Sequence, residues 1–515
     1  MRRSESFVLA ALVGALVLCW VLLTPPGAGA DEPSHFVRAG ALANGDLDEL
    51  LATDLAGEFE VYQLPGEYSI PEPGCFAQNP ATPVDCAVGS DAARTVAPDG
   101  TVTLLSTAGN YPVWGHVAPA IGSALPGDGG IWAARIASAV LSVGLVAGAL
   151  AVARRWPFGP AGVLVALTPM AWSTFAVVNP SAPATAGAVA VWVALAARQP
   201  GWLLAAGWAA LVLPRRDGLT WACLIVAAVV LVCGREVLAD VWRERRRLAG
   251  PLALIGASTL MTLVWDVTNG SRIAQLGALA PGAILGAWAL RWLWDRAAGR
   301  PAHRAALVTL STLAAAAAVG ASFVARPGGW NGAVTRAVIG ETRRHLTEAI
   351  GVLGWLDAPL PRWSVVGWVV LVAALVAVAI SARAWPTLLL GGGALVLAVV
   401  TSWVFELQEG SSYGRYWQGR YSLPLLVGLP IVLGVRQAGR EIDRRAAVAI
   451  AGVALLLVNV AAWAAARRWA VGIHGTHRPW KWGAELIPVH PLLLLTAHAA
   501  ASVALVLTLT RRPTT

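Results

Sequence analysis

Residues 131–153, IWAARIASAVLSVGLVAGALAVA, are apolar or small at every position except Arg135. A helix of this length, roughly 35 Å, can cross the hydrocarbon core of a bilayer, which is roughly 30 Å thick. Similar runs recur along the chain, so that 57% of its 515 residues are hydrophobic and only 13% are charged. Soluble domains carry about 25% charged residues. The composition therefore excludes a soluble globular protein and indicates an integral membrane protein.

The apolar runs predict an all-α, polytopic membrane protein with 13 or 14 transmembrane helices. The predicted spans are 7–23, 131–153, 158–178, 181–197, 201–214, 219–233, 250–266, 274–294, 305–325, 363–381, 385–405, 420–437, 446–466 and 488–509. Those between 181 and 233 are short, and two of them could form one broken or re-entrant span. The strict alternation that a transmembrane barrel needs is absent.

Arginine placement predicts the orientation of the chain. The net charge is +9, and Lys481 is the single lysine. The loops expected in the cytoplasm hold 21 basic and 7 acidic residues, and the rest of the chain holds 17 and 22. By the positive-inside rule, both termini of this multi-pass protein are expected in the cytoplasm. No nucleic-acid-binding motif accompanies the positive charge, so a nucleic-acid partner is not expected.

The N-terminal segment 1–23 permits two interpretations. Arg2 and Arg3, an apolar run and Ala28-Gly29-Ala30 imitate a secretory signal with its cleavage site. The apolar run is long for such a signal and long enough to span. We therefore expect a retained first transmembrane helix, with cleavage as the alternative.

Three segments outside the membrane are larger than simple connections. The first, 24–130, holds 14 of the 29 acidic residues and should contain a membrane-surface helix from about 31 to 44 and strands at 58–63 and 101–105. The second, 326–362, has apolar residues at helical spacing and predicts an amphipathic helix. The third combines 406–419 with 467–487. The remaining predicted transmembrane helices lie in 131–325 and in 363–515.

Cys75 and Cys86 lie together in the first outer loop. On the oxidising side of a membrane this spacing predicts a local disulfide, with two free thiols as the alternative. Cys19, Cys223 and Cys233 lie in predicted spans, where cysteine usually serves as a small packing residue.

The motifs of soluble enzymes are absent, but Asp31-Glu32 follows the first span directly. Carboxylates at the start of a helix are stabilised in the ionised form. Such a group could act as a general base toward a hydroxyl or bind a divalent cation. The alternative is a helix cap with a solvated neighbour. His474 and His477 have metal-ligand spacing but no third ligand nearby, which makes a metal site there a weak prediction.

Two arginine-containing segments adjoin predicted spans on the outer side, Arg215-Arg216-Asp217 and Gln418-Gly419-Arg420-Tyr421. The planar guanidinium group suits a phosphate, and at headgroup depth it suits a lipid-linked phosphate. The alternative is that these arginines only anchor the spans at the membrane interface.

Several of these segments resemble a bacterial family of uncharacterised polytopic membrane proteins. The resemblance covers nearly the whole chain and is strongest in Asp31-Glu32-Pro33-Ser34-His35-Phe36 and in Gln418-Gly419-Arg420-Tyr421 with Pro424. Shorter segments fit in order: Tyr111-Pro112, Thr168-Pro169, Asn179-Pro180, Gly354-Trp355-Leu356-Asp357 with Pro359 and Pro361, and Val471-Gly472. A departure occurs at Tyr111-Pro112-Val113-Trp114, where a second proline and paired tyrosines are expected.

That family is related to the GT-C glycosyltransferases, which implies a GT-C-like fold with a large first extracytoplasmic loop. The resemblance implies Asp31 as the catalytic base and Glu32 as its neighbour or a metal ligand. It implies Arg420, and with less support Arg216 and Arg38, as ligands of the donor phosphate. His35, Tyr421 and Gln418 in the same motifs are further site candidates.

These observations predict an inverting glycosyltransferase in the cytoplasmic membrane with an extracytoplasmic active site. It would move a sugar from a polyprenyl-phosphate donor to a glycan or lipid-linked acceptor of the cell envelope, with no certain cofactor and a divalent cation as an option. The alternatives are a transporter or flippase of lipid-linked glycans and a non-catalytic envelope-assembly protein. The arginine-rich and lysine-poor composition suggests a high-GC bacterium, such as an actinobacterium, for which an arabinose donor is conceivable.

Overall fold

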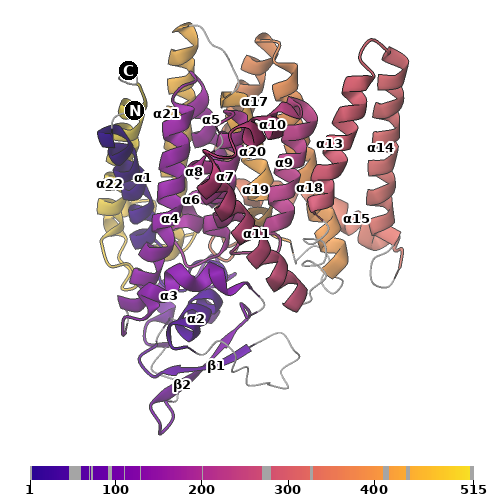
Figure 1. Cartoon of the computed structure of the whole chain (residues 1–515). Coiled ribbons are helices and arrows are strands. Elements are labelled where there is room, and N and C mark those ends of the chain that lie inside the picture. The colour runs from indigo at the N-terminus through magenta and orange to yellow at the C-terminus, as the bar shows by residue number, and fades with distance from the viewer. Residues whose placement is uncertain are drawn as a thin grey trace.

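The computed structural model describes residues 3–45, 60–68, 70, 73–90, 96–109, 111–127, 129–199, 201–269, 280–324, 329–409, 417–435 and 441–510. This part of the chain forms a helical bundle and a smaller domain at one end of it (Figure 1). The two termini lie together at the opposite end of the bundle (Figure 1). We call the end that carries the smaller domain the loop end.

Eight of the described helices are long and apolar enough to cross a membrane. They are α1 (Arg3–Leu23), α4 (Gly129–Ala153), α11 (Ala249–Asn269), α14 (Pro301–Val324), α17 (Arg362–Ser381), α18 (Trp385–Glu409), α21 (Glu441–Val471) and α22 (Pro491–Thr510). A ninth span is counted if α9 (Gly218–Cys233) and α10 (Glu236–Arg243), which are bent by 107°, form one span. The chain is thus a multi-pass membrane protein.

Of the fourteen predicted spans, six are shorter or broken helices in the part of the chain that the structure describes. They correspond to α5 (Gly159–Ala166) with α6 (Pro169–Phe175), α7 (Ser181–Ala196), α8 (Trp202–Val212), α9, α13 (Pro281–Arg296), and α19 (Leu423–Leu426) with α20 (Gly428–Val435). The break before α6 has a local cause: Pro169 lacks an N–H donor and disfavours helical backbone at Thr168.

The bundle core is built from these short helices as well as from the long spans. Every residue of α7 from Ala184 to Ala196 is buried. Between α5 and α20 the backbones approach closely, because a Cβ on Gly162 would lie 2.5 Å from the Pro430 carbonyl oxygen. Small residues allow this kind of contact between membrane helices. The short helices therefore form the centre of the bundle around which the long spans pack.

The smaller domain is made by α2 (Glu32–Ala43), β1 (Glu60–Pro65), β2 (Thr101–Ser106), η4 (Val113–His116) and α3 (Val117–Ser123). The strands pair antiparallel, with Glu60 opposite Ser106 and Pro65 opposite Thr101. Their inward side chains pack on Phe36 and Val37 of α2. The expected membrane-surface helix therefore lies instead in the core of this domain, because the hairpin covers its apolar side.

The segment after β1 is fastened to the C-terminal half of the chain. A disulfide joins Cys75 in η1 (Pro73–Cys75) to Cys86 in η2 (Val84–Ala87). Arg468 of α21 donates hydrogen bonds of 2.7 Å to the carbonyl oxygens of Phe76 and Thr82, which lie within this disulfide loop. The same guanidinium pairs with Asp357 at 2.5 Å. One buried arginine thus holds three segments together.

The remaining outer segments form short elements at the loop end. The expected amphipathic helix of 326–362 is two helices, α15 (Gly332–Gly340) and α16 (Thr342–Gly351), followed by the strand pair β3 (Val352–Leu353) and β4 (Ala358–Pro359). Segment 467–487 contains η6 (Pro479–Lys481). Of segment 406–419, residues 410–416 lie outside the described residues.

We predict that Cys86→Ser loosens the segment from Pro73 to Ser90 while the bundle stays folded. A disulfide that closes a loop of this size stabilises by about 2–4 kcal/mol. Hydrogen exchange in lipid nanodiscs should show faster exchange in 73–90 and unchanged exchange in α7. Cys223→Ser, at a buried cysteine without a disulfide, is the control. Equal protection of 73–90 in both variants would contradict the prediction.

Candidate functional site

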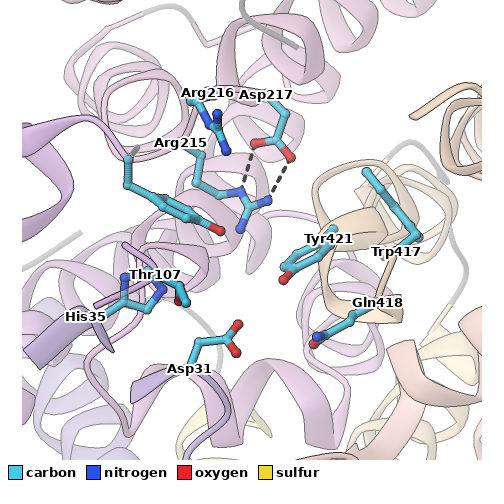
Figure 2. A pocket seen from close by; sticks show the side chains of 10 residues that line it. Asp31, His35, Thr107, Arg215, Arg216, Asp217, Trp417, Gln418 and Tyr421 are labelled. Atoms are coloured by element: carbon cyan, nitrogen blue, oxygen red, sulfur yellow. Dashed lines mark hydrogen bonds and ion pairs between the residues drawn. The ribbon is translucent and has the colours of Figure 1, made fainter. Parts of the chain in front are cut away.

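A pocket of about 310 Å³ lies at the loop end, where the smaller domain meets the bundle (Figure 2). Its lining comes from the start of α2 and the residue before it, both ends of the β2–η4 connection, the α8–α9 connection and the segment before α19. The lining residues are Asp31, His35, Thr107, Tyr111, Arg215, Arg216, Asp217, Trp417, Gln418 and Tyr421. The pocket thus unites five of the predicted site residues, namely Asp31, His35, Arg216, Gln418 and Tyr421.

Asp31 stands immediately before α2 with φ of 59°, in the left-handed region that aspartate tolerates better than most residues. Its side chain makes no capping hydrogen bond to the helix. The carboxylate instead pairs with the guanidinium of Arg420, and its side chain remains 31% exposed. This geometry does not fit the alternative of a helix cap, and it presents a carboxylate to the pocket.

Glu32, the next residue, has a different environment. Its side chain is fully buried and forms two bonds of 2.6 Å with Arg135 of α4. It also accepts hydrogen bonds from the backbone N–H groups of Gly27 and Val178. Both carboxylate oxygens are therefore occupied within the protein, and Glu32 does not line the pocket. Glu32 thus anchors the start of α2 to α4 through Arg135.

Arg420 reaches Asp31 from η5 (Gly419–Ser422), whose backbone is fixed by two carboxylates. Glu348 of α16 accepts from the Gly419 N–H at 2.9 Å, and Glu406 of α18 accepts from the Trp417 N–H at 2.6 Å. A Cβ on Gly419 would lie 2.2 Å from the His345 carbonyl oxygen. Only glycine fits there, so α16 sets the position of Arg420 within narrow limits.

The α8–α9 connection supplies two arginines with different surroundings. Arg215 is buried, makes two bonds of 2.8 Å to Asp217, and lies 4.5 Å from the Tyr421 ring centroid. Arg216 lies against the ring of Tyr111 at 5.8 Å. Among the described residues no carboxylate pairs with Arg216. Arg216 is therefore, among the described residues, the guanidinium of the lining without a direct ion pair, and the buried carboxylate of Asp266 on α11 acts on it at longer range.

Arg38 does not line the pocket. It lies one turn beyond His35 on α2, is buried, and donates a hydrogen bond to the hydroxyl of Tyr62 on β1. The structure thus gives Arg38 a contact inside the core of the smaller domain. This contact is distinct from the phosphate contact that the family resemblance implies.

His35 lines the pocket and contacts a second histidine. Its Nδ1 lies 3.1 Å from Nε2 of His116 at the end of η4, and its ring meets that of Tyr111 edge-on at 4.9 Å. Burial, followed by the charges of Arg420 and Arg215, lowers the pKa of His35 to about 3. Burial, followed by His35 and Arg38, holds the pKa of His116 well below its ordinary value. Both rings are neutral at pH 7.

Sequence reasoning did not identify several residues of the site. Thr107, Tyr111, Asp217 and Trp417 line it, and Arg135, Glu348, Glu406 and His116 hold it in place. Tyr111 and Asp217 belong to sequence segments that are named above, and Trp417 directly precedes Gln418-Gly419-Arg420-Tyr421. Their position in or beside these segments is a signal by which they could be predicted as site residues. Arg135, Glu348 and His116 lie far along the chain from the residues they contact, and no local pattern marks them.

The pocket does not fit a divalent cation. Its two carboxylates, Asp31 and Asp217, are both paired with arginines. Among the described residues no group of three or more His, Cys, Asp or Glu side chains could hold a metal ion.

The family model described as "Predicted membrane protein (DUF2142)" matches residues 15–429. The chain therefore belongs to this family, and the match includes every residue that lines the pocket. No curated protein and no solved structure matches the chain. The predicted resemblance to an uncharacterised membrane family is thus confirmed, while its relation to the GT-C enzymes stays a prediction.

We predict that two isosteric changes at adjacent positions have very different effects on stability. Glu32→Gln leaves Arg135 buried without its counter-charge, and breaking a buried pair in this way costs about 3–5 kcal/mol. Asp31→Asn removes a partly exposed pair and should change stability much less. Thermal unfolding in a mild detergent would measure both, and similar midpoints for the two variants would contradict the prediction.

We also predict that the two histidines make the fold sensitive to acid. An unfolded histidine titrates near 6.5, whereas folded His35 has a pKa of about 3. The unfolded state therefore binds more protons below pH 6.5, so stability falls as the pH drops from 6.5 toward 3, by about 2 kcal/mol at pH 5 for His35 alone. Unfolding midpoints at pH 7 and 5 should differ less in His35→Asn/His116→Asn than in the wild type.

Proposed function

We propose that this family member is a glycosyltransferase of the GT-C type that uses a polyprenyl-phosphate sugar on the outer face of the cytoplasmic membrane. The observation that carries the proposal is the pocket, which places a carboxylate opposite arginines at the loop end of a transmembrane bundle. The Cys75–Cys86 disulfide lies at the same end. Because disulfides persist in oxidising compartments, it supports an extracytoplasmic site.

The charges of the pocket suit one phosphodiester. Arg215 is paired with Asp217 and Arg420 with Asp31, which leaves Arg216 as the arginine of the lining without a direct ion pair among the described residues, although Asp266 of α11 lies near enough to act on its charge. A phosphodiester between a lipid and a sugar carries one negative charge. Arg216, which has no direct ion pair among the described residues, would bind it first, and Arg420 could then exchange Asp31 for a phosphate oxygen.

An apolar groove beside the pocket suits the lipid part of such a donor. It measures about 290 Å³ and lies between α3, α4, α7, α8 and α11. Its lining includes Trp114, Leu141, Leu213 and Leu254, and ends at Pro214, the residue before Arg215. An amphiphile could therefore place its chain among the membrane helices and its phosphate at the arginines.

The proposed reaction is an inverting displacement. Asp31 takes the proton of the acceptor hydroxyl, and the oxygen attacks the anomeric carbon of the sugar. The bond between that carbon and the phosphate oxygen breaks, and its electron pair leaves with the lipid phosphate. Arg216 and Arg420 would stabilise the charge that develops on this leaving group.

The transporter alternative is favoured by one observation. Asp266 of α11 is buried in a span, and neither of its carboxylate oxygens has a hydrogen-bond partner among the described residues. Ionisable groups within membrane spans frequently belong to transport pathways. The test is whether the wild type moves a lipid-linked sugar across the bilayer of proteoliposomes. Loss of this movement in Asp266→Asn would support the second function.

We predict that Asp31→Asn abolishes sugar transfer, with a decrease of about 10²–10⁴-fold in turnover, because asparagine cannot accept the proton. The purified protein in lipid would be assayed with a set of polyprenyl-phosphate sugars and radiolabelled transfer to envelope glycans. Asp99→Asn, at an exposed carboxylate beside β2, is the matched control and should transfer normally. Undiminished transfer by Asp31→Asn would exclude the base assignment. Absence of transfer by the wild type with every donor would argue against an enzyme.

A further inference from the structure

The segment 111–127, which contains η4 and α3, differs in composition from the rest of the first outer loop. That loop, 24–130, holds 14 acidic residues, yet no aspartate, glutamate, lysine or arginine lies between Tyr111 and Gly127. The histidine of this segment, His116, is buried. The outward side of η4 and α3 therefore carries no charged side chain that would favour contact with water.

The exposed side chains of η4 and α3 form an apolar row. Val117, Ile121 and Leu125 are four residues apart, so they lie on one face of α3 and of the turn that follows it. All three are exposed, Ile121 by 73%, and Trp114 of η4 continues the row at its N-terminal end. We call these four residues the apolar row. An exposed row of large apolar side chains marks a surface that contacts a membrane or another protein.

The other sides of α3 are fixed against the protein. A Cβ on Gly122 would lie 2.2 Å from the backbone nitrogen of Ala134, so the backbones of α3 and α4 are in direct contact. On another side of α3, the Tyr68 hydroxyl donates a hydrogen bond to the Ser123 carbonyl oxygen. The helix cannot turn its apolar row inward without breaking these contacts. The exposure of the row is therefore a fixed property of the fold.

The apolar row is continuous with a surface that faces lipid. Trp114 of the row and Leu141 of α4 line the same apolar groove, the one of about 290 Å³. Leu141 lies at the middle of a transmembrane helix and is exposed there, so that the acyl chains of the bilayer cover it. Figure 1 shows α3 beside the loop end of α4. The bilayer is thus the partner that already covers the surface next to the row.

η4 also contacts the connection that carries the arginines of the pocket. A Cβ on Gly115 would lie 2.9 Å from the carbonyl oxygen of Pro214, the residue before Arg215. Tryptophan side chains such as Trp114 prefer the level of the lipid headgroups. An amphipathic surface helix lies with its apolar face about 5–10 Å below that level. With the row at this depth, Arg215 and Arg216 lie beside the lipid phosphates.

We propose that η4 and α3 are inserted into the leaflet at the loop end of the bundle. The apolar row lies among the first carbons of the acyl chains, and the arginines of the pocket lie at the level of the headgroup phosphates. The membrane-surface helix of the first outer loop is therefore α3, whereas α2 is covered by the β1–β2 hairpin. The proposal concerns the position of the pocket in the bilayer, so it holds whether or not the protein transfers sugar.

Spin labels in lipid nanodiscs test the depth of the apolar row. Ile121→Cys is labelled in a Cys233→Ser background, since the other cysteines are buried or joined in the disulfide. Collisions of the label with oxygen, which concentrates in the bilayer, are compared with collisions with a water-soluble nickel chelate. Val140→Cys, at an exposed position of α4, is the lipid reference, and Thr103→Cys, at an exposed position of β2, is the water reference. We expect the ratio of oxygen to nickel collisions at Ile121 to be close to that at Val140.

The two other possible results would overturn the proposal. A ratio at Ile121→Cys equal to that at Thr103→Cys would show that the row lies in water. Protection of the label from both reagents would show that a second copy or another protein covers the row. A label at Trp114→Cys should give a ratio between the two references. A fully aqueous ratio at Trp114 would overturn the placement of the arginines at headgroup level.

Photochemical crosslinking identifies the molecule that contacts the row. A benzophenone attached at Ile121→Cys should form a covalent adduct with the phospholipid of the nanodisc, seen as a mass increase of the intact protein. The same group at Thr103→Cys is the matched control and should form no lipid adduct. Both positions are exposed, so neither change disturbs the core. Equal adduct formation at the two positions, or none at Ile121, would contradict the insertion of α3.

Discussion

The buried pair between Glu32 and Arg135 is the interaction on which the architecture of the site depends. The guanidinium also donates to the carbonyl oxygens of Thr24 and Pro25, which follow α1. One arginine near the start of an apolar span thus binds the end of α1, the start of α2 and the second turn of α4 together. Removing two charges from water is unfavourable, and here several hydrogen bonds at good geometry offset that cost. The direction in which the chain leaves α1 and enters α2 is therefore fixed. Asp31 lies in this connection, directly before α2.

The opposite wall of the pocket is fixed by similar means. Two carboxylates from α16 and α18 bind the backbone before α19, and a glycine allows α16 to approach it. Arg420 therefore meets Asp31 between two rigid supports. Both charged side chains come from segments that have little conformational freedom of their own. A site of this kind is preorganised, and its ligand needs to order few protein groups on binding.

The helical class of the fold follows from local hydropathy, which is why each of the fourteen predicted stretches is helical over most of the part that the structure describes. Their lengths were harder to predict, because a helix that is surrounded by other helices, such as α7, need not span the bilayer to be apolar. The sequence motifs that contain Asp31 and Gln418–Tyr421 predict the position of the pocket. The different roles of Asp31 and Glu32 could not be predicted, because they depend on Arg135 and Arg420. The same holds for Arg215 and Arg216, which are distinguished by the positions of Asp217 and Tyr421 in space, since both residues contact Arg215.

The contacts of Arg468 have a consequence for the order in which the protein can be completed. The carbonyl groups that Arg468 binds lie in the first outer domain, nearly four hundred residues earlier in the chain. During synthesis that domain emerges first, yet its disulfide loop receives this support only after α21 has entered the membrane. The ion pair of Asp31 likewise cannot form until Arg420 has been synthesised. Because the partner segments are so far apart in the chain, the Arg420 wall of the pocket is added after the Asp31 wall, and the support of the disulfide loop by Arg468 is added later still.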